Sequence, residues 1–195
     1  MATNLYEQQH ANPHHVGRDV EITYPGVSSC ITVTFYFPKW MGGPILVGGH
    51  FGKSDGISPN GDDIPVQTGT IDTMMMQIAN LLPGTHTQKY TPTNYLVIGQ
   101  IAAWGNVQTE REYLYKKIRQ IAGVSEIDDK NRWDIGEDGF QSADITVKAN
   151  GFIGVTGAKY VPDGTTRDFV DAFGLHYPIA NLKLANITKR SLFAL

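Results

Sequence analysis

Two residues of the chain could act together as a nucleophile and its base. Cys30 is the single cysteine, and His50 follows it twenty positions later (50 − 30 = 20), in a glycine-rich stretch. Cysteine is a useful nucleophile only as a thiolate, and a histidine is the base that most often takes its proton. The pair therefore predicts cysteine-based nucleophilic catalysis. The alternative is a small buried thiol with a structural role, which is common for a lone cysteine.

The residues around this pair are small. The turn PGVSSC precedes the sulfur, and a turn of this kind can direct backbone N–H groups at an oxyanion that forms beside it. Glycines 48, 49 and 52 surround His50. Since glycine has no Cβ, we expect these positions to leave room for the backbone of a substrate.

Two predicted strands would bring the pair together. Residues 31–37, ITVTFYF, alternate β-branched and aromatic side chains, and Pro38 is predicted to end this strand. Residues 44–48, PILVG, form a short apolar run that suits a buried strand. If these strands pair, Cys30 at the start of one lies beside His50 after the end of the other, at one edge of a sheet.

Two segments have helical periodicity. Residues 71–82, IDTMMMQIANLL, place their apolar side chains on one face, and Thr70 is the expected N-cap. A second helix is predicted from Thr109, which has capping-box spacing to Glu112. Gly123 is the expected residue after its C-terminus.

The other elements complete a mixed arrangement. Residues 20–24 and 95–103 are predicted to be extended, and residues 145–155 to be two strands joined at Asn150-Gly151. Residues 53–69 are rich in Gly, Pro, Asp and Ser and are predicted to be a loop. Strands with two main helices on at least one face predict an α/β or α+β layered sandwich with mixed β-sheets.

Composition argues against several classes of partner and site. The 195 residues are 41% hydrophobic and 18% charged, with a net charge of −3. No basic excess suggests nucleic acid or an anionic membrane as the partner. A single cysteine excludes an intramolecular disulfide and a cysteine-based tetrahedral zinc site. No oligomeric state is predicted.

The chain is predicted to form one domain with two extensions. Residues 1–18 are expected to be a flexible arm, residues 19–157 the domain, and residues 158–195 an extension packed on it, with a short helix near Phe169. No apolar run approaches the roughly 18 residues of a membrane helix, and the polar N-terminus does not resemble a secretory signal. These features predict a cytoplasmic protein, or one exported by a route that reads no such signal.

Two acidic clusters lie outside the Cys/His pair. Both are predicted to be solvated, the first as a flexible loop that could act as a lid and the second as a turn. They consist of Asp55, Asp62 and Asp63, and of Asp134, Glu137 and Asp138.

The segment SSCITVTFYFPKWMGGPILVGGHF resembles the core motif of the CheD family, the chemoreceptor glutamine deamidases. The likeness in element order continues through IDTMMMQIANLL, YLVIGQIAAWG, TEREYLYKKIRQIAG and WDIGEDGFQSADITVKANGFIGV, and covers roughly residues 19–157. The same core occurs in bacterial toxins of the cytotoxic necrotizing factor type. The resemblance implies the CheD-like deamidase fold.

The resemblance also implies roles for individual residues. Cys30 resembles the nucleophile and His50 the general base, with the backbone N–H groups of Ser29 and Cys30 holding the oxyanion. The family has a threonine six positions before the cysteine that orients the histidine, where this chain has Tyr24. Thr23, one step back, fills the role if a bulge shifts the register; otherwise Tyr24 substitutes or the role is vacant.

The implied reaction is deamidation of a glutamine in a protein substrate, giving glutamate and ammonia, with no metal or organic cofactor. Ser28, Trp40 and Phe51 are the expected substrate contacts, with Trp40 at the tip of the predicted hairpin. Two alternatives stay open. One is a translocated toxin-like deamidase of a host protein, and the other is a non-catalytic protein-interaction domain on the same fold.

Overall fold

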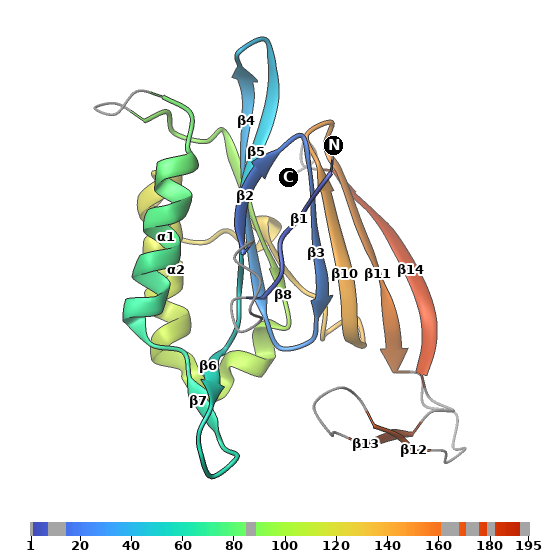
Figure 1. Cartoon of the computed structure of the whole chain (residues 1–195). Coiled ribbons are helices and arrows are strands. Elements are labelled where there is room, and N and C mark those ends of the chain that lie inside the picture. The colour runs from blue at the N-terminus through green and yellow to red at the C-terminus, as the bar shows by residue number, and fades with distance from the viewer. Residues whose placement is uncertain are drawn as a thin grey trace.

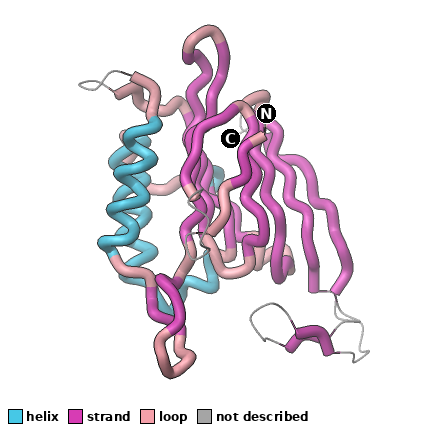
Figure 2. The backbone as a smooth tube through the Cα atoms, in the orientation of Figure 1, coloured by secondary structure: helices cyan, strands magenta, loops and turns pink. Residues whose placement is uncertain are grey.

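The chain folds into three layers, a pair of helices and two five-stranded sheets (Figure 1). Figure 2 shows the two long helices on one side of the central sheet and the second sheet on the other. This arrangement confirms the predicted α+β layered sandwich. The computed structural model describes residues 2–7, 15–84, 89–160, 168–170, 176–178 and 182–191.

The central sheet contains both strands of the Cys/His motif. Its order is β2 (Val16–Asp19), β5 (Gly43–Phe51), β4 (Ile31–Trp40), β8 (Asn94–Gly99) and β9 (Arg132–Asp134). The strands are antiparallel except for the parallel pair β8 and β9. Both strands of the motif are longer than predicted. β4 continues through Pro38 with an irregular register, and β5 continues through His50.

The second sheet has the order β1 (Thr3–Asn4), β3 (Glu21–Val27), β10 (Phe140–Lys148), β11 (Phe152–Tyr160) and β14 (Leu182–Ser191). The predicted hairpin at Asn150-Gly151 is confirmed, because β10 and β11 pair antiparallel across it. Gly151 has a φ of 95°, a conformation that glycine adopts without strain.

The ends of the chain take part in the sheets, which corrects two predicted boundaries. β1 pairs with β3 and β2 pairs with β5, so residues 3–4 and 16–19 of the predicted flexible arm are strands. The boundary expected after residue 157 falls inside β11, and β14 pairs along the whole of that strand. The short helix expected near Phe169 is wrong as well. There β12 (Asp168–Val170) pairs with β13 (His176–Pro178).

Both predicted helices are present, as α1 (Thr68–Leu81) and α2 (Gln108–Ala122), but their predicted N-caps are wrong. The N-cap positions are Gln67 and Val107, and neither makes a side-chain capping bond. Thr70 instead donates to Asp55 from inside the first turn. Gly123 ends α2 with a φ of 70°, as expected.

The capping box predicted at Thr109 fails because a helix already precedes it. The 3-10 helix η1 (Ile101–Val107) runs directly into α2, so the chain is helical before Thr109. The same helix shortens the predicted strand 95–103, which ends at Gly99. A second 3-10 turn, η2 (Asp129–Asn131), precedes β9. None of the helices in the described part of the chain is long and apolar enough to cross a bilayer.

The predicted loop 53–69 contains a small hairpin instead. Its strands are β6 (Ser54–Ile57) and β7 (Asp63–Pro65), and α1 begins three residues later. In Figure 1 this hairpin extends from the end of the molecule opposite to the tip of the β4–β5 hairpin.

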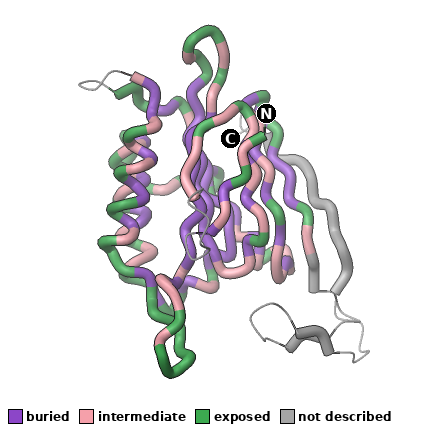
Figure 3. The backbone as a smooth tube through the Cα atoms, viewed as in Figure 1, coloured by how far each residue is buried: buried purple, intermediate pink, exposed green. Residues whose placement is uncertain are grey.

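The central sheet separates two cores, and Figure 3 shows its strands largely buried. One core lies between this sheet and the helices and includes Val33, Phe35, Ile78, Trp104 and Ile118. The other lies between the sheets and includes Ile22, Tyr24, Cys30, Leu46 and Ile145. The candidate cysteine therefore belongs to the core between the two sheets.

Candidate functional site

Cys30 and His50 lie on the same face of the central sheet. His50 pairs directly with Thr32 across β4 and β5, and Cys30 is two residues from Thr32. Since side chains alternate along a strand, Cys30 and Thr32 share a face, and Cys30 becomes a diagonal neighbour of His50. Diagonal neighbours have Cα atoms about 7–8 Å apart. The two strands thus bring the pair to one place, as the sequence predicts.

This place is enclosed between the sheets, so the prediction that the pair meets at an edge is wrong. Both Cys30 and His50 have 0% of their surface exposed. The second sheet covers this face of the central sheet, and the segment before β2 adds a further cover through Leu5 and Glu7, which are also buried. This cover was not expected from the sequence, because the polar residues 1–18 predict a flexible arm.

Glu7 is the functional candidate that the sequence analysis did not find. Its side chain is 5% exposed and accepts a hydrogen bond from the Cys30 thiol. Gly52 gives it space, since a Cβ at that position would collide with the carboxylate. The sequence offered no signal beyond an isolated acidic residue in a polar segment.

Burial raises the pKa of the Cys30 thiol well above its usual value. The negative charge of Glu7 raises this pKa further, both through space and through the hydrogen bond that favours the protonated thiol. Hydrogen bonds from the backbone of Ser29 and Ser28 act in the opposite direction. The balance keeps the sulfur protonated in this arrangement, and the backbone of the PGVSSC turn faces it.

The His50 ring is held in one orientation. Its Nδ1 donates to the carbonyl oxygen of Leu5 at 2.8 Å. In the neutral ring this assigns the proton to Nδ1 and leaves Nε2 as an acceptor. Tyr24 packs edge-on against the ring, with centroids 6.0 Å apart and planes at 88°. An imidazole with an unprotonated Nε2 is the form that can take a proton from a thiol.

Of the two residues proposed for orienting the histidine, the structure brings Tyr24 to His50 and not Thr23. The hydroxyl of Thr23 lies 3.1 Å from that of Thr146 on β10. The hydroxyl of Tyr24 donates to the carbonyl of Val33 at 3.0 Å and bonds Thr34 at 2.6 Å. Burial raises the pKa of Tyr24, so this hydroxyl stays protonated. The imidazole is oriented by the hydrogen bond that it donates to the Leu5 carbonyl, a backbone group with no sequence signature.

The glycines near His50 make room for the protein itself, which corrects the expectation of space for a substrate. A Cβ at Gly48 would collide with the Tyr24 hydroxyl, and one at Gly49 would lie 2.9 Å from Cδ1 of Ile78. Gly52 accommodates Glu7, as described above. These close approaches favour glycine at all three positions.

Two of the three predicted substrate contacts lie away from Cys30. Trp40 is at the opposite end of β4, ten residues along an extended strand, or about 30 Å from Cys30. Phe51 belongs to the core beneath the helices, on the other face of the sheet. Ser28 is half-buried in the turn beside Cys30. The carbonyl of its neighbour Ser29 accepts a hydrogen bond from Trp104 at 2.9 Å, which anchors the turn.

The acidic clusters are partly structural, which corrects their interpretation as solvated segments. Asp134 accepts hydrogen bonds from the backbone N–H groups of Ile101 and Ala102, at the start of η1. Asp138 accepts from the indole N–H of Trp133 at 2.6 Å. Asp62 and Asp63 are exposed, as expected. Among the residues that the structure describes, no group of three or more His, Cys, Asp or Glu side chains is placed to hold a metal ion.

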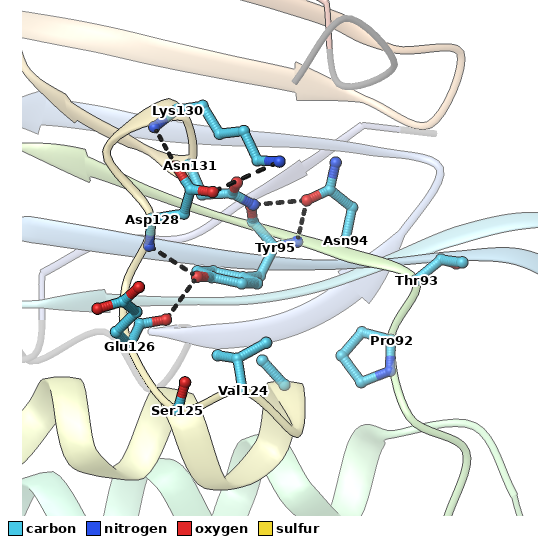
Figure 4. Close-up of a pocket in the computed structure, with 11 residues that line it drawn as sticks. Pro92, Thr93, Asn94, Tyr95, Val124, Ser125, Glu126, Asp128, Lys130 and Asn131 are labelled. Carbon is cyan, nitrogen blue, oxygen red and sulfur yellow. Dashed lines mark hydrogen bonds and ion pairs between the residues drawn. The ribbon is translucent and has the colours of Figure 1, made fainter.

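A surface cavity of about 360 Å³ lies between β8 and the segment after α2 (Figure 4). Several polar side chains that line it are used in hydrogen bonds within the chain. Asn131 donates to the side chain of Asn94 and to the carbonyl of Tyr95, both at 2.6 Å. The Tyr95 hydroxyl donates to the carbonyl of Glu126 and accepts from the N–H of Asp128. These bonds fasten the segment to the sheet, and neither Cys30 nor His50 lines the cavity.

Comparisons of the chain with protein-family models, curated proteins and solved structures find no significant match. The likeness to the CheD family therefore stays a prediction from the motif and from the element order.

Proposed function

We propose that the chain is a cysteine-dependent amide hydrolase that converts a glutamine side chain of a protein substrate to glutamate. The observation that supports this proposal most strongly is the placement of Cys30 and His50. They share one face of adjacent strands, and the imidazole is oriented by Leu5 so that Nε2 can accept a proton. A thiol nucleophile and its base have to come within hydrogen-bonding reach of each other, and the diagonal placement of Cys30 and His50 on neighbouring strands supports this.

The proposed reaction needs only these two side chains, the turn and water. His50 takes the proton of Cys30, and the sulfur attacks the amide carbon of the glutamine side chain. Backbone N–H groups of the turn at Ser29 and Cys30 stabilise the oxyanion. The C–N bond then breaks, the proton on His50 passes to the leaving ammonia, and a thioester remains. Water, deprotonated by His50, hydrolyses the thioester to glutamate and returns the proton to the sulfur.

This reaction requires the cover over the sulfur to open. In the described arrangement the second sheet, Leu5 and Glu7 together enclose the site, and the Glu7 carboxylate favours the protonated thiol. We therefore propose that the closed arrangement is the resting state, and that displacement of residues 5–7 exposes the sulfur. The Leu5 carbonyl has to stay near His50 to keep the imidazole oriented. We therefore expect Glu7 to move farther from the site than Leu5 when the sulfur is exposed.

The competing function is a protein-interaction domain without catalysis. The complete burial of Cys30 and its raised pKa favour this function, because both are properties of a structural thiol. On this hypothesis Glu7, His50 and Tyr24 form a polar network that ties the N-terminal segment to the two sheets. The two functions differ in whether the thiol reacts under native conditions.

The first experiment measures ammonia release and the one-dalton mass increase from β-casein and from an N-blocked Gln-Gly dipeptide. We expect activity in the parent chain, none in Cys30→Ser, and strong loss in His50→Gln. Thr73→Ser, on the exposed side of α1, is the matched control and should retain activity. Equal ammonia release by the parent and by Cys30→Ser would contradict the proposal.

Thiol alkylation separates the two functions if neither probe is a substrate. Iodoacetamide labelling is followed by intact mass on the folded chain. Labelling that proceeds without global unfolding, and that slows in His50→Gln, supports catalysis. Labelling that occurs only at the rate of global unfolding, and is the same in His50→Gln, supports the interaction domain. Thermal unfolding of each variant checks that it is folded.

A further inference from the structure

The tip of the β4–β5 hairpin carries exposed apolar side chains, at the end of β4 opposite to Cys30. Figure 1 shows this tip at the end of the molecule opposite to the β6–β7 hairpin. Met41 is 91% exposed, and Trp40 packs at an angle of 65° against the ring of Tyr90, which is itself 59% exposed. These three side chains are called the hairpin tip below. An exposed apolar group of this kind at a protruding turn is a candidate contact surface.

The backbone of the hairpin tip is strained at its most exposed residue. Trp40 pairs with Gly43, so Met41 and Gly42 form a two-residue turn. Their φ angles are 46° and 96°, and Met41 is the only non-glycine residue in the described part of the chain with a positive φ. Turns of this type favour Asn or Gly at both positions. A large apolar side chain there opposes local stability, and its exposure means that packing within the chain does not compensate.

The charge around the hairpin tip differs from that of the whole chain. The segments FPKWMGGP (37–44) and KYTPTN (89–94) contain two lysines and no acidic residue, although the net charge of the chain is −3. Lys39 is exposed beside Trp40. Lys89 precedes Tyr90, and its ammonium lies 3.3 Å from the carbonyl of Leu82 near the C-terminus of α1. The hairpin tip thus has one exposed lysine beside it, Lys39, and a second nearby in the chain, Lys89, whose ammonium contacts the carbonyls of Asn80 and Leu82 at the end of α1.

The opposite hairpin, β6–β7, is a natural control for this observation. It also exposes apolar side chains, with Ile57 at 68% and Ile64 at 39%. Its charge has the opposite sign, because Asp55, Asp62 and Asp63 lie within it. Exposure alone therefore does not distinguish the two hairpins, whereas aromatic composition and charge do.

We propose that the hairpin tip docks onto an anionic lipid surface. Met41 and Trp40 would enter the interfacial region, and Lys39 and Lys89 would lie among the negatively charged headgroups. Tryptophan and tyrosine favour the membrane interface, and lysines near an anionic leaflet are attracted to it. A specific protein interface needs about 20–30 residues on each side, more than this convex turn offers. Lipid headgroups, in contrast, can rearrange around a protruding tip.

The experiment measures cosedimentation of the full chain with vesicles of phosphatidylcholine and phosphatidylserine, compared with phosphatidylcholine alone. We expect binding to the anionic vesicles, and a loss of about fivefold in partitioning for each of Lys39→Ala and Lys89→Ala. Brominated lipid should quench Trp40 fluorescence, because the other two tryptophans, Trp104 and Trp133, are buried.

Met41→Asn is the decisive variant. Asn-Gly suits the turn, so this variant should unfold at the same or a higher temperature while binding to the anionic vesicles falls. Ile57→Ser, on the opposite hairpin, should bind like the parent. No binding of the parent to anionic vesicles, or equal binding by Met41→Asn, would overturn the proposal. So would binding to a DNA oligonucleotide that depends on the two lysines and not on Met41, because that pattern identifies a polyanion site.

Discussion

The two faces of strand β4 meet interiors of different chemistry. Toward the helices the strand presents apolar side chains only, Ile31, Val33, Phe35 and Phe37. Toward the second sheet it presents Thr32, Thr34 and Tyr36, with Cys30 directly before the strand on the same side. These residues lie with His50, Tyr24 and Glu7 in the interior between the sheets. One strand therefore separates an apolar core from a core that contains polar and titratable groups.

The polar groups between the sheets are hydrogen-bonded to one another or to the backbone. Thr32 donates to the carbonyl of Ile98 at 2.8 Å, and Thr34 bonds the Tyr24 hydroxyl. Such networks cost desolvation energy that well-packed aliphatic side chains avoid. The core beneath the helices shows that this fold can be held by apolar packing. The polar groups between the sheets are therefore the part of the interior where function is to be sought.

The largest expected effect is on the apolar side of this comparison. Phe35→Ala removes a fully buried aromatic ring beneath the helices and should lower the free energy of unfolding by about 3–5 kcal/mol. Urea unfolding monitored by circular dichroism measures the change. A loss below about 1 kcal/mol would mean that packing against the helices contributes little to stability. The apolar face of β4 would then not be the face that holds the fold together.

A smaller loss is expected on the polar side. Tyr24→Phe removes the hydroxyl that bonds Val33 and Thr34, and it leaves the Thr34 hydroxyl without that partner in a buried site. The expected cost is about 1–3 kcal/mol by urea unfolding. Tyr90→Phe is the matched control, because Tyr90 is exposed, and it should unfold like the parent. Equal stability of both variants would show that the buried network is energetically neutral.

The pH dependence of stability should identify Cys30. Burial raises the pKa of the folded-state thiol, so the unfolded chain loses this proton first as the pH rises. Stability from this group is complete below the unfolded pKa of about 8.5 and then falls by up to about 1.4 kcal/mol per pH unit until the folded pKa is reached. Unfolding measured between about pH 8 and pH 9.5, below the titration of ordinary tyrosine and lysine, should show this decline in the parent. A decline that persists unchanged in Cys30→Ala would assign it to another group.

The sequence predicted the layers better than it predicted the site. Periodicity located both helices, and the Asn150-Gly151 turn located the β10–β11 hairpin, because these signals are local. The pairing of β4 and β5 also followed from local strand signals, and it places Cys30 and His50 on one face. Helix starts failed where distant groups decide them. Asp55 bonds the first turn of α1, and η1 runs into α2.

The environment of Cys30 could not be predicted because it depends on contacts between distant parts of the chain. The segment around Leu5 and Glu7 is polar and lacks periodicity, so nothing in it indicates that it covers a histidine 45 residues away. The glycines near His50 were interpreted as open space, whereas the side chains of Tyr24 and Glu7 occupy that space. A missing Cβ shows only that something approaches closely. What approaches is decided by the tertiary fold.

The smallest change in stability is expected for Glu7→Gln. This variant tests whether the Glu7 carboxylate controls the reactivity of the Cys30 thiol. Glutamine keeps the shape and can still accept the thiol hydrogen bond, so the free energy of unfolding should change by less than about 1 kcal/mol. Removing the negative charge removes one cause of the raised pKa of Cys30. A larger fraction of the sulfur is therefore thiolate at a given pH, and iodoacetamide labelling at fixed pH should accelerate severalfold. Intact mass over time measures this rate.

Two further variants show whether that acceleration arises at the site. Gly52→Ala displaces the Glu7 carboxylate by a different route, so it should also accelerate labelling of Cys30. Glu21→Gln, an acidic residue paired with Lys148 on the second sheet, should leave the rate unchanged. If Glu7→Gln and Glu21→Gln label at the parent's rate, the carboxylate does not control the thiol. The polar side of β4 would then be a structural network and not a closed catalytic site.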